Sequence, residues 1–269
     1  MIILMSKRIL KTSFFMVSGI LNVLTVCAQK LPGTQEKSVA LPSTVKIDGI
    51  ADEWNNQFQA FNKSTDVYYT MANDKDNLYL VVQATDPVII KKIVGGGITL
   101  TVYASGKKNE VNPLSVTFPL IASDLHSGIN VSYNDLAASK TNKDSVLNAL
   151  NKKLTAAEKE IKVKGFKSIN DSLMSVYNDM GIKTATVFNN KNALTYELMI
   201  PLKLTGMVSG TQIAYNIRLN SITSIRPRPA AGHSGVMVAT ISRALTTNNS
   251  DIDILQNDTD FWGKYLITN

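Results

Sequence analysis

Few side chains in this sequence could make or break covalent bonds. It contains two histidines, His126 and His233, and a single cysteine, Cys27. Neither histidine lies near a GxSxG motif, so nothing indicates a serine nucleophile with a histidine base. The histidines are far apart in the sequence and lack the HExxH spacing of a zinc site. Nucleophilic and zinc-dependent catalysis are therefore not expected.

Acidic residues are numerous enough to supply the carboxylate pair of a glycoside hydrolase, but their positions have simpler explanations. The three acidic residues between positions 48 and 53 precede Trp54 in a turn, where capping and turn hydrogen bonds use the same residue types. Asp74 and Asp76 have the spacing of calcium ligands, and a tight polar turn has the same composition. We expect no enzymatic activity, and calcium is the one cofactor that the sequence leaves open.

The residues that fit a binding role better are aromatic and planar polar side chains. Sugar recognition uses flat aromatic rings against the C–H faces of pyranoses, with planar polar groups that bond to hydroxyls. For the tyrosines the alternative is packing in the core or on a sheet face, and for the arginines it is a solvated loop. The candidates are Tyr68, Tyr79, Tyr103, Arg226, Arg228, His233 and Trp262.

These candidates lie on or between short segments with the period-two alternation of β-strands. Glycine, asparagine, aspartate and proline turns separate the segments, which favours an antiparallel β-sandwich over a parallel α/β sheet. We expect Trp54 to fill one end of the sandwich, with its indole N–H bonded to a backbone acceptor. The expected strands are 45–47, 66–71, 78–86, 98–103, 114–121, 183–188, 194–202, 212–220 and 236–241, and residues 260–267 close the domain.

One region changes from strand to helix periodicity. Residues 144–163 place apolar side chains on one stripe of an amphipathic helix, which Gly165 ends. Asn170 and Asp171 are suited to cap a second short helix that ends at Gly181. The sequence thus predicts a two-helix insertion around 142–181, either as a lid or partner-binding element or as a cover for apolar sheet surface.

The first 28 residues have the pattern of a signal peptide. Three basic residues precede the apolar stretch 14–26, and Ala28 is a suitable cleavage site. About 13 apolar residues are too few to cross a bilayer, which takes roughly 20. Lipidation of Cys27 is the alternative, and it would need a small residue where Val26 stands. We expect an exported protein, periplasmic or secreted, without stable membrane insertion after cleavage.

Cleavage after Ala28 would change the charge and the cysteine content. The formal net charge is +7, and loss of three basic residues leaves +4, because 7 minus 3 is 4. This balance is weak support for a nucleic-acid partner, and we expect none. The mature chain would have no cysteine and hence no disulfide. It would consist of a flexible arm, 29–43, and one domain, 44–269.

Four short motifs in a fixed order resemble carbohydrate-binding modules of family 9 and their DOMON-like relatives. They are IDG-x-x-DEW at 47–54, a DxxNLYL strand at 74–80 that ends in Thr85-Asp86, YELMIPL at 196–202 and IAYNIRLN at 213–220. The resemblance implies a β-sandwich of jelly-roll or immunoglobulin-like character. Modules of this family that bind sugar ends clamp them between two tryptophans. With Trp54 assigned to the fold, only Trp262 remains, so the clamp does not carry over to this chain.

Two functions follow from the sequence. The first is an exported, non-catalytic binding module that recognises a glycan. The second is a structural or protein-interaction sandwich that has lost the sugar site and contacts a protein through the helices or through the loop 226–233. An aromatic pair on one groove would favour the first function, and an apolar outer face on the helices would favour the second.

Overall fold

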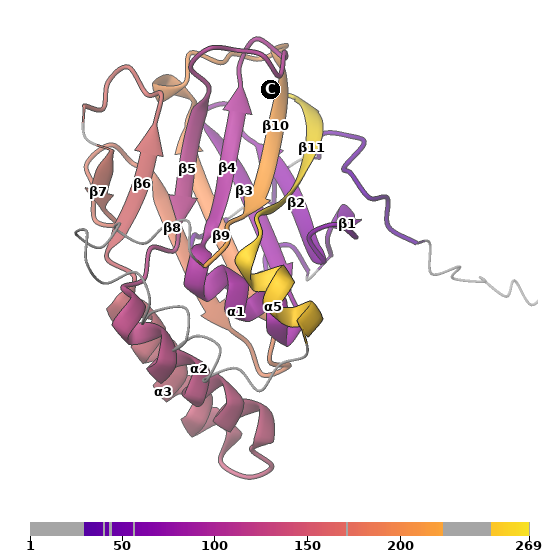
Figure 1. Ribbon diagram of the computed structural model, residues 1–269. Helices are drawn as coiled ribbons and strands as arrows, with labels where there is room; N and C mark the ends of the chain where they lie inside the picture. Colours follow the sequence, from indigo (N-terminus) through magenta and orange to yellow (C-terminus); the bar gives the residue numbers. More distant parts are fainter. Residues whose placement is uncertain are drawn as a thin grey trace, which may run out of the picture. The chain divides into compact units, whose positions relative to one another are not determined.

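The computed structural model describes residues 30–39, 41–42, 45–55, 57–170, 172–222 and 249–268. By its internal contacts the chain divides into two units, Met1–Lys30 and Leu31–Asn269, and the second is the unit described below. It contains two antiparallel β-sheets that face each other, with helices at one end (Figure 1). The predicted antiparallel sandwich is confirmed. None of the described helices is both long enough and apolar enough to cross a membrane.

Each sheet draws its strands from distant parts of the sequence. The five-stranded sheet has the order β1 (Ala60–Asn62), β2 (Val67–Asn73), β3 (Asn77–Ala84), β9 (Leu194–Pro201), β8 (Lys183–Phe188). The six-stranded sheet has the order β11 (Thr259–Leu266), β10 (Gln212–Leu219), β4 (Ile98–Tyr103), β5 (Leu114–Phe118), β6 (Glu160–Lys164), β7 (Leu173–Ser175). All strand pairs are antiparallel, as the short polar turns between the expected strands predicted.

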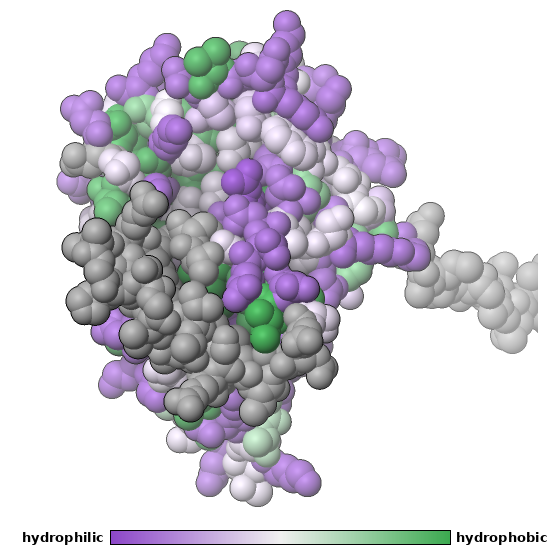
Figure 2. Space-filling view, viewed as in Figure 1, coloured by the Kyte–Doolittle hydropathy of each residue, from purple (hydrophilic) through white to green (hydrophobic). Residues whose placement is uncertain are grey.

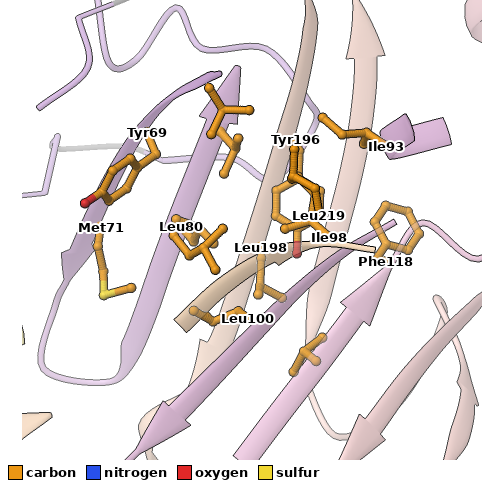
Figure 3. Packing of buried hydrophobic residues seen from close by; sticks show 14 of the residues in the cluster. Tyr69, Met71, Leu80, Ile93, Ile98, Leu100, Phe118, Tyr196, Leu198 and Leu219 are labelled. Carbon is orange, nitrogen blue, oxygen red and sulfur yellow. The ribbon is translucent and has the colours of Figure 1, made fainter. Parts of the chain in front are cut away.

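The main core fills the space between the sheets. Inward side chains from both sheets meet there, each fully buried one contributing about 1.5–3 kcal/mol, and Figure 3 shows Met71, Leu80, Leu100, Phe118 and Leu198 among them. The hydroxyls of Tyr69 and Tyr215 hydrogen-bond across the core at 2.9 Å. A Cβ on Gly263 would lie 2.2 Å from the Tyr215 hydroxyl oxygen. Glycine at this position therefore lets the Tyr215 ring cross the neighbouring strand.

The helix α1 (Pro87–Gly96) follows β3 directly and was not expected from the sequence. The Asp86 side chain caps it by accepting from the N–H groups of Val88 and Ile89, and proline occupies its first turn. Gly97 ends it at a φ of +75°, which favours glycine. Only this last residue of the glycine run acts as the turn into β4 that the sequence predicted.

The helical insertion is real but begins earlier than predicted. Its helices are α2 (Ser123–Ala138) and α3 (Lys143–Ala157), not two helices within 142–181. The sequence of α2 is rich in Ser, Asn and Gly, which are weak helix formers. Ile129, Tyr133 and Leu136 nevertheless form a buried stripe along it. Among the residues that the structure describes, the other helical segments are the 3-10 turn η1 (Leu202–Leu204) and α5 (Asn249–Gln256).

The predicted helical residues after position 157 form strands instead. Glu158 terminates α3, and β6 then alternates exposed residues with the buried Ile161 and Val163. This alternation lets β6 pair with β5, so apolar burial against the sheet replaces a further helical turn. The predicted second helix is also wrong, because Leu173–Ser175 pairs with β6 as the edge strand β7.

The insertion covers the edge of the five-stranded sheet. Leu150 and Leu154 of α3 are fully buried. The Asn151 side chain donates to the Phe188 carbonyl and accepts from the Phe188 N–H, both at 2.9 Å, and so bonds the free edge of β8. An edge strand covered in this way cannot pair with another chain. At this contact α3 has one of the two roles expected for the insertion, which is to cover sheet surface.

Residues 31–39 and 41–42 are not the flexible arm that the sequence predicted. Gln35 is only 4% exposed and bonds Met71 through both side-chain groups, Nε2 to the carbonyl at 2.8 Å and Oε1 from the N–H at 2.7 Å. Pro32 accepts from the Phe61 N–H at 3.0 Å. β1 ends its pairing with β2 at Tyr69, so Met71 would otherwise have unpaired backbone groups. The segment therefore completes the sheet edge.

Trp54 packs on the outer face of the five-stranded sheet, with Tyr79 and Val81, and not at the end of the sandwich. Its Nε1 donates to the Glu197 carboxylate at 3.3 Å, where a backbone acceptor was expected. The other carboxylate oxygen accepts from the N–H groups of Asp48 and Gly49 at 3.0 and 2.8 Å. Glu197 thus joins the first and third of the motifs that carry the family resemblance.

Candidate functional site

The outer face of the six-stranded sheet is polar, and strand alternation produces it. On β10, Ile213, Tyr215 and Ile217 point into the core, so Ala214, Asn216 and Arg218 point outward. On β11, the same alternation turns Asp260, Trp262 and Lys264 outward. In Figure 2, hydrophilic side chains gather over β10 and β11 on this face.

Two aromatic rings meet on this face. Tyr103 of β4 lies opposite Ala214, and Trp262 of β11 lies opposite Asn216, so the rings approach each other diagonally across β10. Their centroids are 5.0 Å apart and their planes are inclined at 40°. The Ala214 side chain is small enough to lie beneath them and is 1% exposed. Lys108 places its Nζ 4.6 Å from the Trp262 ring centroid, a cation–π contact.

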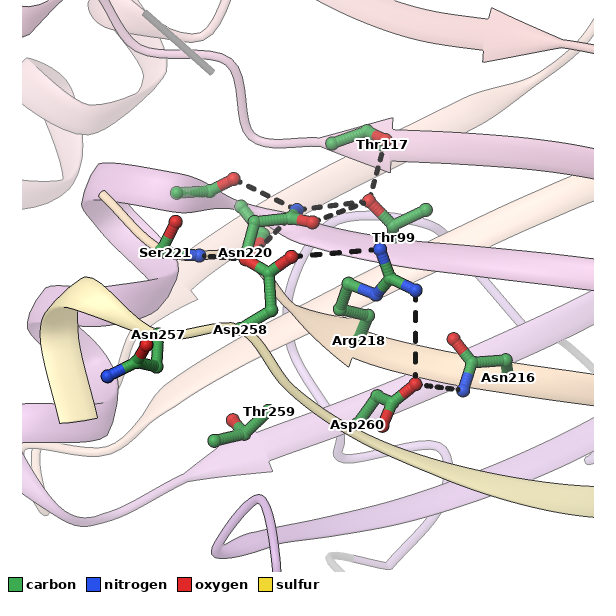
Figure 4. Close-up of polar contacts among 12 residues, drawn as sticks. Thr99, Thr117, Asn216, Arg218, Asn220, Ser221, Asn257, Asp258, Thr259 and Asp260 are labelled. Carbon is green, nitrogen blue, oxygen red and sulfur yellow. Dashed lines mark hydrogen bonds and ion pairs between the residues drawn. The ribbon is translucent and has the colours of Figure 1, made fainter. Parts of the chain in front are cut away.

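A network of planar polar groups lies next to the rings (Figure 4). Asn216 Nδ2 donates to Asp260 Oδ2 at 2.8 Å and to the Phe261 carbonyl at 3.0 Å. The Arg218 guanidinium lies 3.7 Å from Asp258 Oδ2 and 3.9 Å from Asp260 Oδ2. These contacts fix the guanidinium between two carboxylates, while all three charged side chains stay partly exposed.

The network is anchored below by α1. Lys92 is completely buried, and its Nζ donates to the Asn257 carbonyl at 2.6 Å and to Thr259 Oγ1 at 2.9 Å. Burial lowers the pKa of Lys92 to about 8, against the opposing effect of the nearby Asp258 carboxylate. Asn220 donates to the carbonyl of Gly96 at 3.0 Å and so joins the other side of the network to the end of α1.

The structure brings together two of the predicted binding residues, Tyr103 and Trp262. Tyr68 lies on β2 of the other sheet, where its ring centroid is 4.6 Å from that of Phe61 and 5.9 Å from that of Phe58. Tyr79 is buried on that sheet too. The remaining predictions, Arg226, Arg228 and His233, and the expected strand 236–241, lie outside the described residues.

The acidic turn considered for calcium is held by its own hydrogen bonds. Asp74 Oδ1 accepts from the N–H groups of Asp76 and Asn77 at 2.8 and 2.6 Å, and Oδ2 accepts from the Tyr79 hydroxyl at 2.9 Å. The exposed Asp76 carboxylate lies 3.4 Å from Lys75 Nζ. Within the described ranges, no group of three or more His, Cys, Asp or Glu side chains could hold a metal ion.

The same turn borders the larger of two cavities. This cavity, of about 670 Å³, lies at the end of the sandwich away from α1, and its lining mixes Asp76 and Asp179 with Lys183, Lys203 and Met207. The second, of about 450 Å³, is lined mainly by apolar groups of α2 and α3 and the segments beside them. Neither cavity contains the aromatic pair.

Several residues of the polar face were missed at the sequence level. Asn216, Arg218 and Asp260 carry a period-two signal, because polar residues alternate with apolar ones in both QIAYNIRLN and DFWGKY. The polar positions of each alternation predict that these three side chains lie on the same face of the sheet. Lys108 and Asp258 come from loops, where no periodicity marks them.

The arrangement offers two partly exposed aromatic rings beside fixed hydrogen-bonding groups, which suits recognition of a polar ligand with apolar faces. No protein-family model and no curated protein matches the chain. A solved structure that is similar to it is a carbohydrate-binding module of family 9 from Caldicellulosiruptor kristjanssonii in complex with glucose. The match covers 87% of this chain and 96% of that chain, with a TM-score of 0.39 and 10% sequence identity.

Proposed function

We propose that this protein is a non-catalytic binding module that recognises a glycan on the outer face of its six-stranded sheet. The observation that carries the proposal is the contact between Tyr103 and Trp262, side by side and partly exposed. Aromatic rings bind the apolar faces of sugars, and few other ligands combine such faces with many hydroxyls.

The polar groups next to the rings supply the second half of a sugar site. Arg218 and Asp260 offer partly exposed guanidinium and carboxylate groups, and the buried Asn216 amide holds the Asp260 carboxylate in place. Fixed planar groups of this kind bond adjacent hydroxyls without a large loss of side-chain entropy on binding. The second aromatic ring is a tyrosine, so the site would differ from the two-tryptophan clamp of family-9 modules.

The experiment is a glycan-array screen of the purified protein, followed by titration calorimetry on the best ligand. Trp262→Ala should weaken binding by tenfold or more, an expected size of about 1.4 kcal/mol or above for loss of a large aromatic contact. The matched control is Tyr177→Ala, which removes a 78% exposed aromatic ring elsewhere. Silence across neutral and acidic glycans, or binding that Trp262→Ala leaves intact, would exclude the proposal and favour a protein-interaction role.

We also propose that the protein is exported after cleavage behind Ala28. The support is the basic, then apolar, then small-residue pattern of the first 28 residues. N-terminal sequencing of protein isolated from the periplasm or the medium should begin at Gln29. A chain that begins at Cys27 and carries lipid would point to membrane anchoring in its place.

A further inference from the structure

The polar face continues beyond the aromatic pair across most of the six-stranded sheet. Cross-strand pairs link Trp262 to Asn216, Asn216 to Thr101, Thr101 to Ser115, and Ser115 to Lys164. Because neighbouring strands are about 4.8 Å apart, these four steps span about 19 Å. The face is therefore long enough for an oligosaccharide and not only for a single sugar.

A second row runs parallel to the first. It links Asp260 to Arg218, Arg218 to Thr99, Thr99 to Thr117, and Thr117 to Lys162. The hydroxyls of Thr99 and Thr117 bond each other at 2.8 Å. Small hydroxyl side chains thus form the floor of both rows, and each row ends at an exposed lysine of β6.

Cations also surround the aromatic end of the face. Lys108 lies over the Trp262 ring, and the exposed Lys264 lies opposite Ala214. Neither these two lysines nor Lys162 and Lys164 has a carboxylate within 4.0 Å among the residues that the structure describes. The acidic groups Asp258 and Asp260 both contact Arg218, and Glu160 lies beyond Lys162 on the same exposed side of β6. Four lysines are thus left to face a ligand.

We propose that the ligand is an anionic glycan, held by the aromatic pair at one end and by Lys162 and Lys164 at the other. The inference rests on the proposed glycan-binding function and adds the charge class of the ligand. The hydroxyl side chains of the two rows contact neutral parts of the glycan, and the lysines at both ends of the rows pair with its acidic substituents. Uronic carboxylates and sulfate esters share this chemistry.

The test compares ligands that differ only in charge. Calorimetry would measure polygalacturonate oligomers against their methyl esters, and dextran sulfate against dextran. We expect the charged member of at least one pair to bind about tenfold more tightly, since two exposed ion pairs supply about that factor. Raising NaCl from about 50 mM to about 500 mM should remove the preference by screening. A carboxylate-only or sulfate-only preference identifies the acidic group.

Variants separate this inference from the proposed function. The double variant Lys162→Ala, Lys164→Ala should bring the charged-to-neutral ratio of affinities close to one. Lys183→Ala with Lys191→Ala, two exposed lysines away from this face, should leave the ratio as in the wild type. Equal binding of charged and neutral members by the wild type overturns the inference and leaves glycan binding in place. Failure to bind any of the four probes or any array glycan overturns both.

Discussion

Ala214 sets the distance between the two rings of the candidate site. It lies opposite Tyr103 on one side and Lys264 on the other, beneath rings whose centroids are 5.0 Å apart. A larger side chain there would push the rings outward and apart. The aromatic surface therefore depends on one small residue on the central strand as well as on the rings themselves.

Ala214→Leu tests this dependence. We expect glycan affinity to fall about tenfold and the free energy of unfolding to fall by about 1–3 kcal/mol, as for other overpacked sites. Titration calorimetry and urea unfolding measure the two effects. The control is Ala156→Leu at an exposed position of α3, which should change neither by much. Unchanged affinity in Ala214→Leu would mean that the ligand does not contact the ring pair.

At the residue scale, sequence reasoning found the rings of the site but not their setting. Tyr103 and Trp262 were candidates because of their type, which is visible in any sequence. Their contact depends on the register of β4 and β11 across β10, in which Tyr103 pairs with Ala214, 111 positions away, and Trp262 pairs with Asn216, 46 positions away. Tyr68 has the same residue type and the same strand context, yet it belongs to the other sheet. The order of the strands in the two sheets is what places Tyr68 away from Tyr103 and Trp262.

At the scale of elements, the Glu197 carboxylate holds the turn that precedes Trp54. Three N–H groups, from Asp48, Gly49 and the Trp54 indole, donate to it. Gly49 has a φ of +82° and its Cβ position is 2.6 Å from Val187 Cγ2, so a larger residue there is excluded. Burial raises the pKa of Glu197 to about 7, even though the three hydrogen bonds act in the opposite direction.

Removal of this carboxylate should release the turn. We expect Glu197→Ala to lower the free energy of unfolding by about 3 kcal/mol or more, because it leaves buried donors without an acceptor. Urea unfolding followed by Trp fluorescence reports both the global stability and the surroundings of Trp54. Glu160→Ala, an exposed glutamate on β6, is the matched control and should change stability by less than about 0.5 kcal/mol. Equal effects of the two substitutions would contradict this role.

We expect the contact between α3 and the five-stranded sheet to stabilise the fold in a pH-dependent way, through Glu158. Its carboxylate hydrogen-bonds Thr186 of β8, and burial raises its pKa from about 4.5 to about 8, more than this bond and Lys159 lower it. It also ends a helix, where a negative charge is unfavourable. A raised pKa means that the folded state binds the proton more tightly, so this stabilisation is present below about pH 4.5 and is lost as the pH rises to about 8.

The measurement is the free energy of unfolding from about pH 4.5 to about pH 8, for the wild type and for Glu158→Gln. The difference between them should change by at most about 5 kcal/mol over this range, with the wild type losing stability relative to the variant as the pH rises. Glu160→Gln serves as the exposed control. Parallel pH profiles for the wild type and Glu158→Gln would show that Glu158 titrates normally.

Elements were predicted well where the period of the sequence was clear. The strands β2, β3, β4, β9 and β10 lie close to their expected bounds. The helix α1 was missed because its ten residues look like a strand followed by a glycine turn, and the cap by Asp86 decides the outcome. Residues 160–163 were assigned to the first helix because an apolar stripe of α3 happens to extend into β6, which the pairing with β5 overrides.

In the molecule as a whole, the two sheets differ in how far their outer faces are covered. The outer face of the five-stranded sheet is covered in part by residues 31–39, 41–42, 45–54 and Phe58, which pack over Tyr79 and Val81. The outer face of the six-stranded sheet keeps a polar surface with partly exposed rings. The sandwich was predictable from turns and alternation, but which sheet would be covered was not. That depends on a segment whose composition resembles a free arm and whose hydrogen bonds with Met71 form only in the folded chain.

The packing of residues 31–39 also brings the first and last parts of the described domain together. Ser38 Oγ donates to the Leu266 carbonyl at 2.5 Å, and Asn73 Nδ2 donates to the Thr268 carbonyl at 2.6 Å. The order of the strands in the sequence can therefore be changed without changing their order in the two sheets. A circular permutant that joins the end of β11 to residue 31 through a short linker, and opens the chain between Asn190 and Lys191, should fold with the same sheets. Its circular dichroism spectrum should match that of the wild type.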